Sequence, residues 1–247
     1  MVDNASTDGS PDLVRDRVAE HGQLELVEMG RNAGYAAAVN AGATRVPGRD
    51  LLLLNPDIRL DEPGPARELA RVLDAHPKVG VAAPRLVGED GQPQATARRF
   101  PSAAALLGTL PRLGGLGPVR RGLERYHEPS AARRATVVDW VLGAAMLIRR
   151  RAFDEVGGWD ERFFLYVEDV DFCRRLRRVG WEVAYVPEAE LTHVYAKASD
   201  ARRASVMNSS VRRRHLAGHA RLFLREPRLL LGRGRGTDRQ LEPGPKR

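Results

Sequence analysis

Acidic side chains are concentrated in the run Glu168-Asp169-Val170-Asp171, which places three carboxylates within four residues. Repulsion between like charges, together with desolvation, raises a carboxyl pKa toward a value suited to a general base. The aromatic residues Trp159, Phe163, Phe164 and Tyr166 precede the run and are expected to form the apolar wall of a cleft. We therefore interpret the run as a catalytic cluster at the start of a helix, in preference to a solvated acidic turn.

A second polar cluster, Asn55-Pro56-Asp57, follows the unbroken apolar run 51–54. A carboxylate beside an amide oxygen at the end of a strand could hold Mg²⁺ or Mn²⁺ that also binds substrate phosphates. An ordinary Pro-Asp turn explains the tripeptide equally well. His193 ends another strand-like segment, and it becomes a candidate metal ligand only if the fold brings it near Asp57.

The third cluster is residues 3–10, a run of short polar side chains that leads into a helix. Backbone amide groups and the helix dipole at such a place favour an anionic or nucleotide ligand. A turn with a helix cap explains the same residues, and for this segment alone we favour that simpler interpretation.

Helices and strands alternate along the first 200 residues, which predicts an open α/β sheet. Ligands of such sheets bind beyond the carboxyl ends of the strands, where the polar clusters fall. Residues 101–135 have weak periodicity and are expected to cross the surface as an irregular excursion. Helices are expected over residues 10–20, 35–44, 62–75, 151–156, 168–179 and 201–224, and strands over 24–28, 51–54, 79–83, 137–148, 182–186 and 191–194.

Composition excludes several classes of protein. With 247 residues, 43% hydrophobic and 29% charged, the chain is expected to be a soluble globular protein. No apolar run approaches the roughly 18 residues that a membrane-spanning helix needs. The single cysteine, Cys173, excludes an internal disulfide. No signal segment opens the chain, so we expect a cytoplasmic location.

The net charge of +8 is distributed unevenly. Residues 201–247 contain 13 Lys or Arg and 3 Asp or Glu, a net charge of +10, so residues 1–200 carry −2. This division predicts a folded domain over 1–200 and a basic helix with a tail over 201–247. Such a segment suits an anionic partner, either a membrane surface or a nucleic acid.

In this order, the motifs resemble those of glycosyltransferase family 2, in particular its rhamnosyltransferase-like branch, which builds bacterial cell-wall and surface polysaccharides. The resemblance covers residues 1–200. It is carried by the segments 3–10, 32–36 with Asn40, 54–57, 143–146, 157–161 and 168–171. Only Met1 and Val2 precede the Asp3 motif, so the resemblance also implies that the family's first strand is missing.

The resemblance implies a GT-A fold, which is a Rossmann-like, mostly parallel α/β sheet flanked by helices. It also implies a metal-dependent, inverting transfer from a nucleotide-diphosphate sugar. Asp169 then matches the catalytic base, and Asp57 with His193 would hold Mg²⁺ or Mn²⁺. Asn55 stands where the family's metal motif begins with an aspartate. The implied donor-binding residues are Asp3, Asn4, Ser6, Asp8, Asn32, Gly34, Asn40, Asn55 and Asp57, and the acceptor-binding residues are Gly143, Ala144, Trp159, Asp160, Glu168 and Asp171.

The expected partners are a nucleotide sugar, a lipid-linked glycan acceptor and the anionic inner face of the plasma membrane, with no nucleic acid. The basic C-terminal segment would contact that membrane through arginines such as Arg221 and Arg225. Leucines such as Leu216, Leu222 and Leu224 would insert into it. Three alternatives stay open: an inactive truncated remnant, a nucleotidyltransferase, and a nucleic-acid binder that uses the basic tail.

Overall fold

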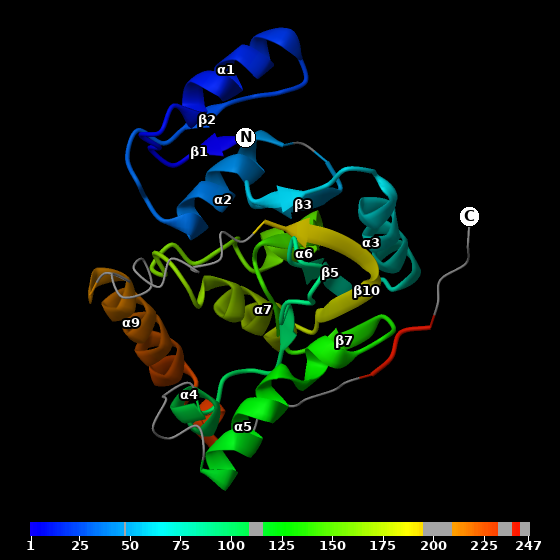
Figure 1. Ribbon diagram of the computed structural model, residues 1–247, viewed down its shortest axis with the longest axis vertical. Coiled ribbons are helices and arrows are strands. Elements are labelled where there is room, and N and C mark those ends of the chain that lie inside the picture. The colour runs from blue at the N-terminus through cyan, green and yellow to red at the C-terminus, as the bar shows by residue number, and fades with distance from the viewer. Residues whose placement is uncertain (47, 109–115, 195–208, 232–238, 243–247) are drawn as a thin grey trace.

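The computed structural model describes residues 1–46, 48–108, 116–194, 209–231 and 239–242 (Figure 1). Its helices are α1 (Ser10–Glu20), α2 (Tyr35–Arg45), α3 (Gly64–Ala75), α4 (Ala103–Gly108), α5 (Gly117–His127), α6 (Arg150–Glu155), α7 (Glu168–Arg178) and α9 (Ser209–Arg225), with 3₁₀ turns η1 (Glu128–Ala131) and η2 (Pro227–Leu231). Its strands are β1 (Val2–Asp3), β2 (Val27–Glu28), β3 (Asp50–Leu54), β4 (Ile58–Arg59), β5 (Val79–Val87), β6 (Ala97–Arg98), β7 (Thr136–Val138), β8 (Trp140–Val141), β9 (Ala145–Arg149) and β10 (Glu182–His193). The expected α/β class is confirmed.

The central sheet has six strands in the order β3-β9-β5-β10-β4, and β7 also pairs with β10. Only β5 and β10 are parallel, whereas β9 runs antiparallel to both β3 and β5. Ala145, the first residue of β9, pairs with Leu54, the last residue of β3. The two strands therefore run in opposite directions. The sheet is therefore mixed, not mostly parallel as expected.

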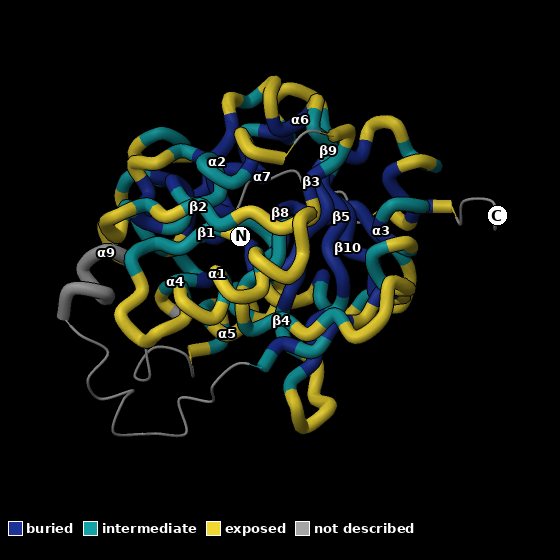
Figure 2. The backbone as a smooth tube through the Cα atoms, turned by 90° about the horizontal axis from the view of Figure 1, so that it is seen from above, coloured by how far each residue is buried: buried dark blue, intermediate teal, exposed yellow. Residues whose placement is uncertain are grey.

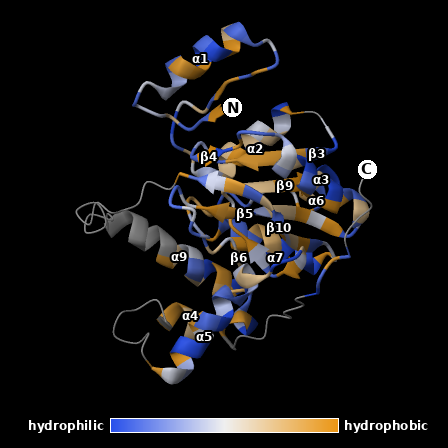
Figure 3. Cartoon of the chain, turned by 45° about the vertical axis from the view of Figure 1, so that its right-hand side comes forward, coloured by the Kyte–Doolittle hydropathy of each residue, from blue (hydrophilic) through white to orange (hydrophobic). Residues whose placement is uncertain are grey.

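Helices cover both faces of this sheet. Leu69 and Leu73 of α3 pack with Val79 and Ala82 on one face, and a larger core on the other face includes Val81. Because side chains alternate between the two faces of a strand, β5 supplies both cores and reads as a continuous apolar run. The strands at the centre are accordingly buried and apolar (Figures 2 and 3).

Strand β3 is not buried on both faces, although it contains the unbroken apolar run 51–54. It lies at the end of the strand order and pairs only with β9, and Leu52 is 40% exposed. Strand β2 is also shorter than predicted, because only Val27 and Glu28 pair, with β1. This small parallel pair and α1 lie at one end of the molecule, and α4 and α5 lie at the other (Figures 1 and 3).

Residues 101–135 correct another expectation. The described part of this segment forms α4, α5 and η1, not an irregular excursion. The two helices pack closely because Gly122 has no side chain: a Cβ there would lie 2.7 Å from the Ala104 Cβ. The two strands predicted over 182–194 are one strand, β10, with register irregularities between Glu182 and Val183 and between Val186 and Glu190.

Strand register brings three polar segments to one edge of the sheet. The backbone N–H of Asn55, just after β3, donates to the Ala144 carbonyl just before β9 (2.8 Å). His193 at the end of β10 pairs with Ile58 of β4, and the Val194 N–H donates to the Asp57 carbonyl (2.8 Å). The sheet thus places Asn55, Asp57, Ala144 and His193 together.

Candidate active site

Asp57 and His193 form a corner that is suited to a cation. The Asp57 Oδ2 lies 3.2 Å from the His193 Nε2, and the His193 Nδ1 lies 2.7 Å from the Gln94 Oε1. An amide oxygen can only accept, so the Nδ1 carries the proton and, in the neutral ring, the Nε2 turns a lone pair toward the carboxylate. The Asp57 Oδ1 is buried and has no hydrogen-bond partner among the described residues. Two facing acceptors and an orphaned carboxylate oxygen fit a divalent ion that takes further ligands from phosphates.

No group of three or more His, Cys, Asp or Glu residues able to hold a metal occurs in the described part of the chain. A cation at this corner would therefore have two protein ligands at most from these residue types. Mg²⁺ commonly binds through one or two carboxylates together with substrate phosphates, so this ligand set is compatible with it.

Tyr35 connects this corner to the acidic cluster. Its hydroxyl lies 2.8 Å from the Asn55 Oδ1 and 2.6 Å from the Gly143 carbonyl oxygen. The Gly143 N–H donates to the Asp169 Oδ2 (3.2 Å). Burial raises the pKa of the Tyr35 hydroxyl, and the charges of Asp169, Glu168 and Asp57 raise it further. The charges of all three carboxylates therefore act on one partly buried phenol.

Glu168 and Asp169 are both buried at the start of α7, with 6% and 8% of their surfaces exposed. Burial, followed by the charge of Asp169, raises the pKa of Glu168 to about 8. Burial also raises the pKa of Asp169, but N–H groups of Gly143 and Val170 and the charge of Arg98 oppose that rise. The Glu168 Oε2 has no such partner in the described part of the chain. The shared proton therefore favours Glu168, and Asp169 is the ionised member of the pair.

The backbone just before these carboxylates is strained. Tyr166 and Val167 have φ angles of 68° and 72°, in the left-handed region that a β-branched residue rarely adopts. Strain of this kind persists where the surrounding structure imposes it, and it is concentrated at functional sites. Gly218 of α9 packs closely against this segment, because a Cβ at this glycine would lie 3.1 Å from the Val167 Cγ2.

The predicted donor loops contact each other. Asn4 holds the loop before α2: its Oδ1 accepts from the Ala33 N–H (2.9 Å) and its Nδ2 donates to the Gly34 carbonyl (3.2 Å). The Asn4 Nδ2 also lies 3.3 Å from the Asn32 Oδ1. The carboxylate of Asp3 accepts from the N–H groups of Ala5 and Ser6 (3.1 and 3.2 Å).

Asp8 lies at the exposed start of α1, where its Oδ1 accepts from the Ser10 N–H (3.1 Å). Hydrogen bonds from Ser10 hold the pKa of Asp8 below its usual value. Asn40 lies on α2 and clamps the loop before α7, because its Oδ1 accepts from the Trp159 N–H and its Nδ2 donates to the Trp159 carbonyl (both 2.9 Å).

The four aromatic residues before α7 form the expected apolar wall only in part, because Phe163 is buried in the core whereas Tyr166 is 43% exposed. Trp159 stacks on Phe172 with ring centroids 5.1 Å apart, and its edge meets Tyr35 at 5.5 Å. The wall also explains the small residue at position 143, since a Cβ there would lie 3.0 Å from the Trp159 ring and 3.5 Å from the Asp169 Cβ. The structure therefore places Trp159, Gly143 and Asp169 against one another.

Asp160 and Asp171 are engaged in ion pairs. Asp171 is fully buried between Arg174 (2.9 Å) and Arg175 (2.7 Å). Asp160 pairs with Arg162 and with Arg225 of α9, each at 2.8 Å. Burial raises the pKa of Asp160, but hydrogen bonds from the two arginines outweigh it and hold the pKa below its usual range. These carboxylates fasten α9 and α7 to the aromatic wall.

Sequence reasoning missed three residues of the site as functional candidates. Tyr35 is the hydroxyl at its centre, Gln94 orients His193, and the charge of Arg98 acts on Asp169. Arg98 lies over the rings of Tyr126 (5.7 Å) and Trp140 (5.1 Å). A tyrosine directly after the Asn-Ala-Gly segment was a usable signal for Tyr35, whereas nothing in the local sequence marks Gln94 or Arg98.

Comparisons with known proteins identify the family of the chain. The family model described as "Glycosyl transferase family 2" matches residues 1–157, and "Glycosyltransferase like family 2" matches residues 120–216. The chain is 34% identical to an N-acetylglucosaminyl-diphospho-decaprenol L-rhamnosyltransferase of Mycobacterium tuberculosis over 230 residues, covering 89% of this chain and 70% of that protein.

Solved structures support the fold. The mannosyltransferase PcManGT from Pyrobaculum calidifontis, in complex with GDP-Man and Mn²⁺, superposes with a TM-score of 0.53 and 20% identity over 93% of this chain and 61% of that chain. GalNAc-T7 with UDP, GalNAc and Mn²⁺ gives a TM-score of 0.55 and 16% identity over 78% of this chain and 37% of that chain. At these identities the likeness concerns the GT-A fold alone.

Proposed function

This chain belongs to glycosyltransferase family 2, and we propose that it transfers a sugar, with rhamnose our first choice, from a nucleoside-diphosphate sugar to a hydroxyl of a lipid-linked glycan. The observation that carries the proposal is the series of contacts that runs from Asp169 through Gly143 to the Tyr35 hydroxyl and Asn55, next to the Asp57–His193 corner. The sugar and the acceptor class follow the name of the mycobacterial relative.

Asp169 is the proposed catalytic base. It accepts the proton of the acceptor hydroxyl as that oxygen attacks the anomeric carbon, and the nucleoside diphosphate leaves from the opposite face. The backbone N–H of Gly143 fixes the Asp169 Oδ2, and protonated Glu168 keeps a second negative charge away from the base. Holding both substrates in line removes much of the entropic barrier.

Asp57 and His193 are the proposed ligands of Mg²⁺ or Mn²⁺, and Gln94 orients the imidazole. When bound, the cation neutralises charge that develops on the leaving diphosphate. Asn55 contributes a neutral oxygen and lies beside the Tyr35 hydroxyl, so it orders the corner without adding charge.

The proposed donor pocket is formed by the loops that carry Asp3, Asn4, Ser6, Asp8, Asn32 and Gly34. Asn40 supports it indirectly through the Trp159 backbone. On the acceptor side, Gly143, Ala144, Trp159 and Glu168 line the approach to Asp169, whereas Asp160 and Asp171 act as positioning residues because arginines occupy their oxygens.

The proposed location is the inner face of the plasma membrane, reached through α9. No helix in the described part of the chain is both long and apolar enough to span a bilayer. Leu216 (63% exposed) and Leu224 (85% exposed) are available for insertion, but Leu222 is buried in the core. Arg225 pairs with Asp160 and Arg221 donates to the Arg162 carbonyl, so both fasten α9 to the protein. Arg202 and Arg203 lie outside the described residues.

The proposed function is tested by incubating the purified chain with Mn²⁺, a nucleoside-diphosphate rhamnose and lipid-linked N-acetylglucosaminyl diphosphate. We expect rhamnosylated lipid and one nucleoside diphosphate released per transfer. Release of pyrophosphate would identify a nucleotidyltransferase instead, and no product with any nucleoside-diphosphate sugar would refute the proposal.

The metal corner is tested separately by thermal shift. Nucleoside diphosphate with Mn²⁺ should stabilise the wild type, and Asp57→Ala should abolish the part of the shift that depends on Mn²⁺. Asp61→Ala, which removes an exposed carboxylate nearby, is the matched control. An unchanged metal-dependent shift in Asp57→Ala would exclude Asp57 as a ligand.

A further inference from the structure

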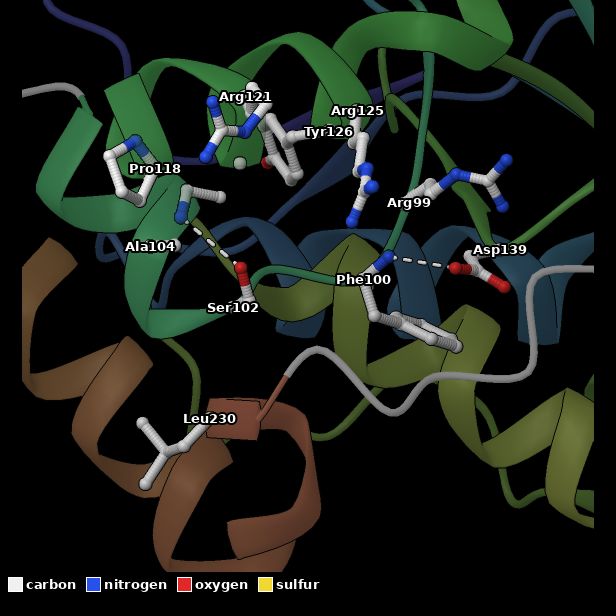
Figure 4. Close-up of a pocket in the computed structure, with 12 residues that line it drawn as sticks. Arg99, Phe100, Ser102, Ala104, Pro118, Arg121, Arg125, Tyr126, Asp139 and Leu230 are labelled. Atoms are coloured by element: carbon white, nitrogen blue, oxygen red, sulfur yellow. Dashed lines mark hydrogen bonds between the residues drawn. The ribbon is translucent and has the colours of Figure 1, made fainter. Parts of the chain in front are cut away.

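A pocket of about 420 Å³ lies between α4, α5 and η2, away from the donor loops (Figure 4). Its lining includes Arg99, Phe100, Arg121, Arg125, Tyr126 and Leu230. We call it the arginine pocket. Its volume falls within the roughly 300–1,000 Å³ typical of small-molecule sites.

One face of α5 supplies the charged side of the arginine pocket. Pro118, Arg121, Gly122 and Arg125 all line it, at the spacing of one helical face. Arg121 and Arg125 are four residues apart and have no acidic partner among the described residues. Like charges at this spacing repel each other and destabilise a helix, and an anion bound beside both guanidinium groups relieves that repulsion.

The other side of the pocket is apolar. Leu230 of η2 lies across the pocket from α5, and Phe100 lies between them (Figure 4). The one acid in the lining, Asp139, accepts from the Phe100 N–H (3.0 Å) and lies 3.8 Å from the Arg177 guanidinium. Cationic and apolar surfaces therefore face one cavity, which is the chemistry that recognises an anion attached to a hydrocarbon chain.

Tyr126 connects the arginine pocket to the catalytic cluster. Its ring lines the pocket and also lies under the guanidinium of Arg98, whose charge acts on Asp169. The negative charge of Asp169 contributes to the raised pKa of Tyr126, after burial as the main cause. Tyr126 thus links the arginine pocket to Arg98, whose charge acts on Asp169, whereas none of the pocket's lining belongs to the Asp57–His193 corner.

We propose that the arginine pocket binds the diphosphate and the first isoprenoid unit of the lipid-linked acceptor, with Arg121 and Arg125 as anion ligands and Leu230 on the apolar side. In such an acceptor, one sugar ring separates the attacking hydroxyl from the diphosphate, which fits a pocket whose Tyr126 ring lies under Arg98, the residue whose charge acts on Asp169. The apolar tail then leaves beside η2, directly after α9. This inference rests on the proposed function and deepens it.

Direct binding tests the inference without requiring turnover. Farnesyl diphosphate should bind the wild-type chain in calorimetry, and Arg121→Ala and Arg125→Ala should each weaken this binding about tenfold, as expected for a charge-assisted contact. Arg120→Ala is the matched control, because Arg120 lies on the same helix but pairs with Glu124 (3.5 Å) outside the pocket. Leu230→Gln should weaken binding of farnesyl diphosphate but not of inorganic pyrophosphate.

Three results would overturn the inference: no binding of farnesyl diphosphate, equal binding by the Arg121, Arg125 and Arg120 variants, or binding that requires Mn²⁺ and Asp57. Transfer assays separate this outcome from failure of the proposed function. The arginine variants should raise KM about tenfold for a diphosphate-linked acceptor and leave it unchanged for a phosphate-free glycoside and for the donor. Farnesyl diphosphate binding without any transfer would refute the proposed function while supporting the pocket.

Discussion

At the scale of single residues, Glu168 and Asp169 show how hydrogen bonds give two buried carboxyl groups different protonation states. Burial acts on both, but only Asp169 receives the N–H groups of Gly143 and Val170. Sequence alone could predict that three acids in four residues perturb one another. The spacing of Asp171 from Arg174 and Arg175 on the predicted helix permits ion pairs, but only the fold shows that Asp171 is fully buried between them.

Replacing Asp169 with Asn should remove the base and keep its shape. We expect kcat to fall by roughly 10²–10⁴-fold, the usual contribution of a general base. Donor affinity, measured by thermal shift with Mn²⁺, should stay within about twofold. Asp154→Asn, at an exposed carboxyl of α6, is the control for loss of charge. Near-normal turnover in Asp169→Asn would contradict the assignment.

The raised pKa of Glu168 predicts a pH dependence of stability. The folded state holds this proton up to about pH 8, whereas the unfolded chain releases it near 4.5. The stabilisation is therefore complete below pH 4.5 and is lost as the pH rises through 8. Glu168→Gln removes the titration, so its unfolding free energy should fall less between pH 5 and pH 9 than that of the wild type, by on the order of 4 kcal/mol.

Denaturant unfolding at pH 5, 7 and 9 measures the difference between the two proteins. Glu89→Gln is the control, because Glu89 is 58% exposed. Equal pH dependence in the wild type and Glu168→Gln would show that Glu168 titrates normally.

At the scale of elements, residues that start or end helices made several helices predictable. Pro11 lies in the first turn of α1, and Gly180 follows the end of α7. The expected helix limits differ from the observed limits by two residues or fewer for α1, α2, α3, α6 and α7. Helices α4 and α5 were not predicted because they are stabilised by packing against each other at Gly122, and this tertiary contact leaves no local sequence signal. The convergence at the site was equally invisible, because it depends on the register of β3 with β9 and of β4 with β10.

The start of α2 can be used to test whether the close backbone contact between Gly34 and Phe164 holds this helix in place. Gly34 has φ of +94°, and a Cβ there would lie 2.6 Å from the Phe164 carbonyl oxygen. Gly157 also has a positive φ (+72°), but nothing lies within 4 Å of its Cβ position. Gly157→Ala should therefore cost about 1 kcal/mol from backbone strain alone, and Gly34→Ala at least about 2–3 kcal/mol.

Denaturant unfolding measures both losses of stability. Gly34→Ala should also reduce transfer, because the Tyr35 N–H donates to the same Phe164 carbonyl (3.0 Å) and the phenol would be displaced. Equal losses of stability in the two variants would mean that the contact between Gly34 and Phe164 does not constrain α2.

At the scale of the whole molecule, the donor loops and the arginine pocket lie on different sides of α7 (Figure 1). Strands β1 and β2 with α1 form one end, and α4, α5 and η2 form the other (Figures 1 and 3). A lipid acceptor that enters beside η2 would reach the base without crossing the donor loops. Because η2 directly follows α9, binding of α9 to a membrane would bring the opening of the pocket close to that membrane.

This arrangement predicts that α9, not basic charge in general, orients the protein on a bilayer. Leu216 and Leu224 are eight residues apart, so they share an exposed face of α9. The double variant Leu216→Asp/Leu224→Asp should lower partitioning onto vesicles of anionic phospholipid at least tenfold, since it removes two inserted side chains and adds repulsion. Leu13→Asp, at a 69% exposed leucine of α1, should leave it unchanged. Co-sedimentation measures all three proteins, and equal partitioning would mean that α9 does not contact the membrane.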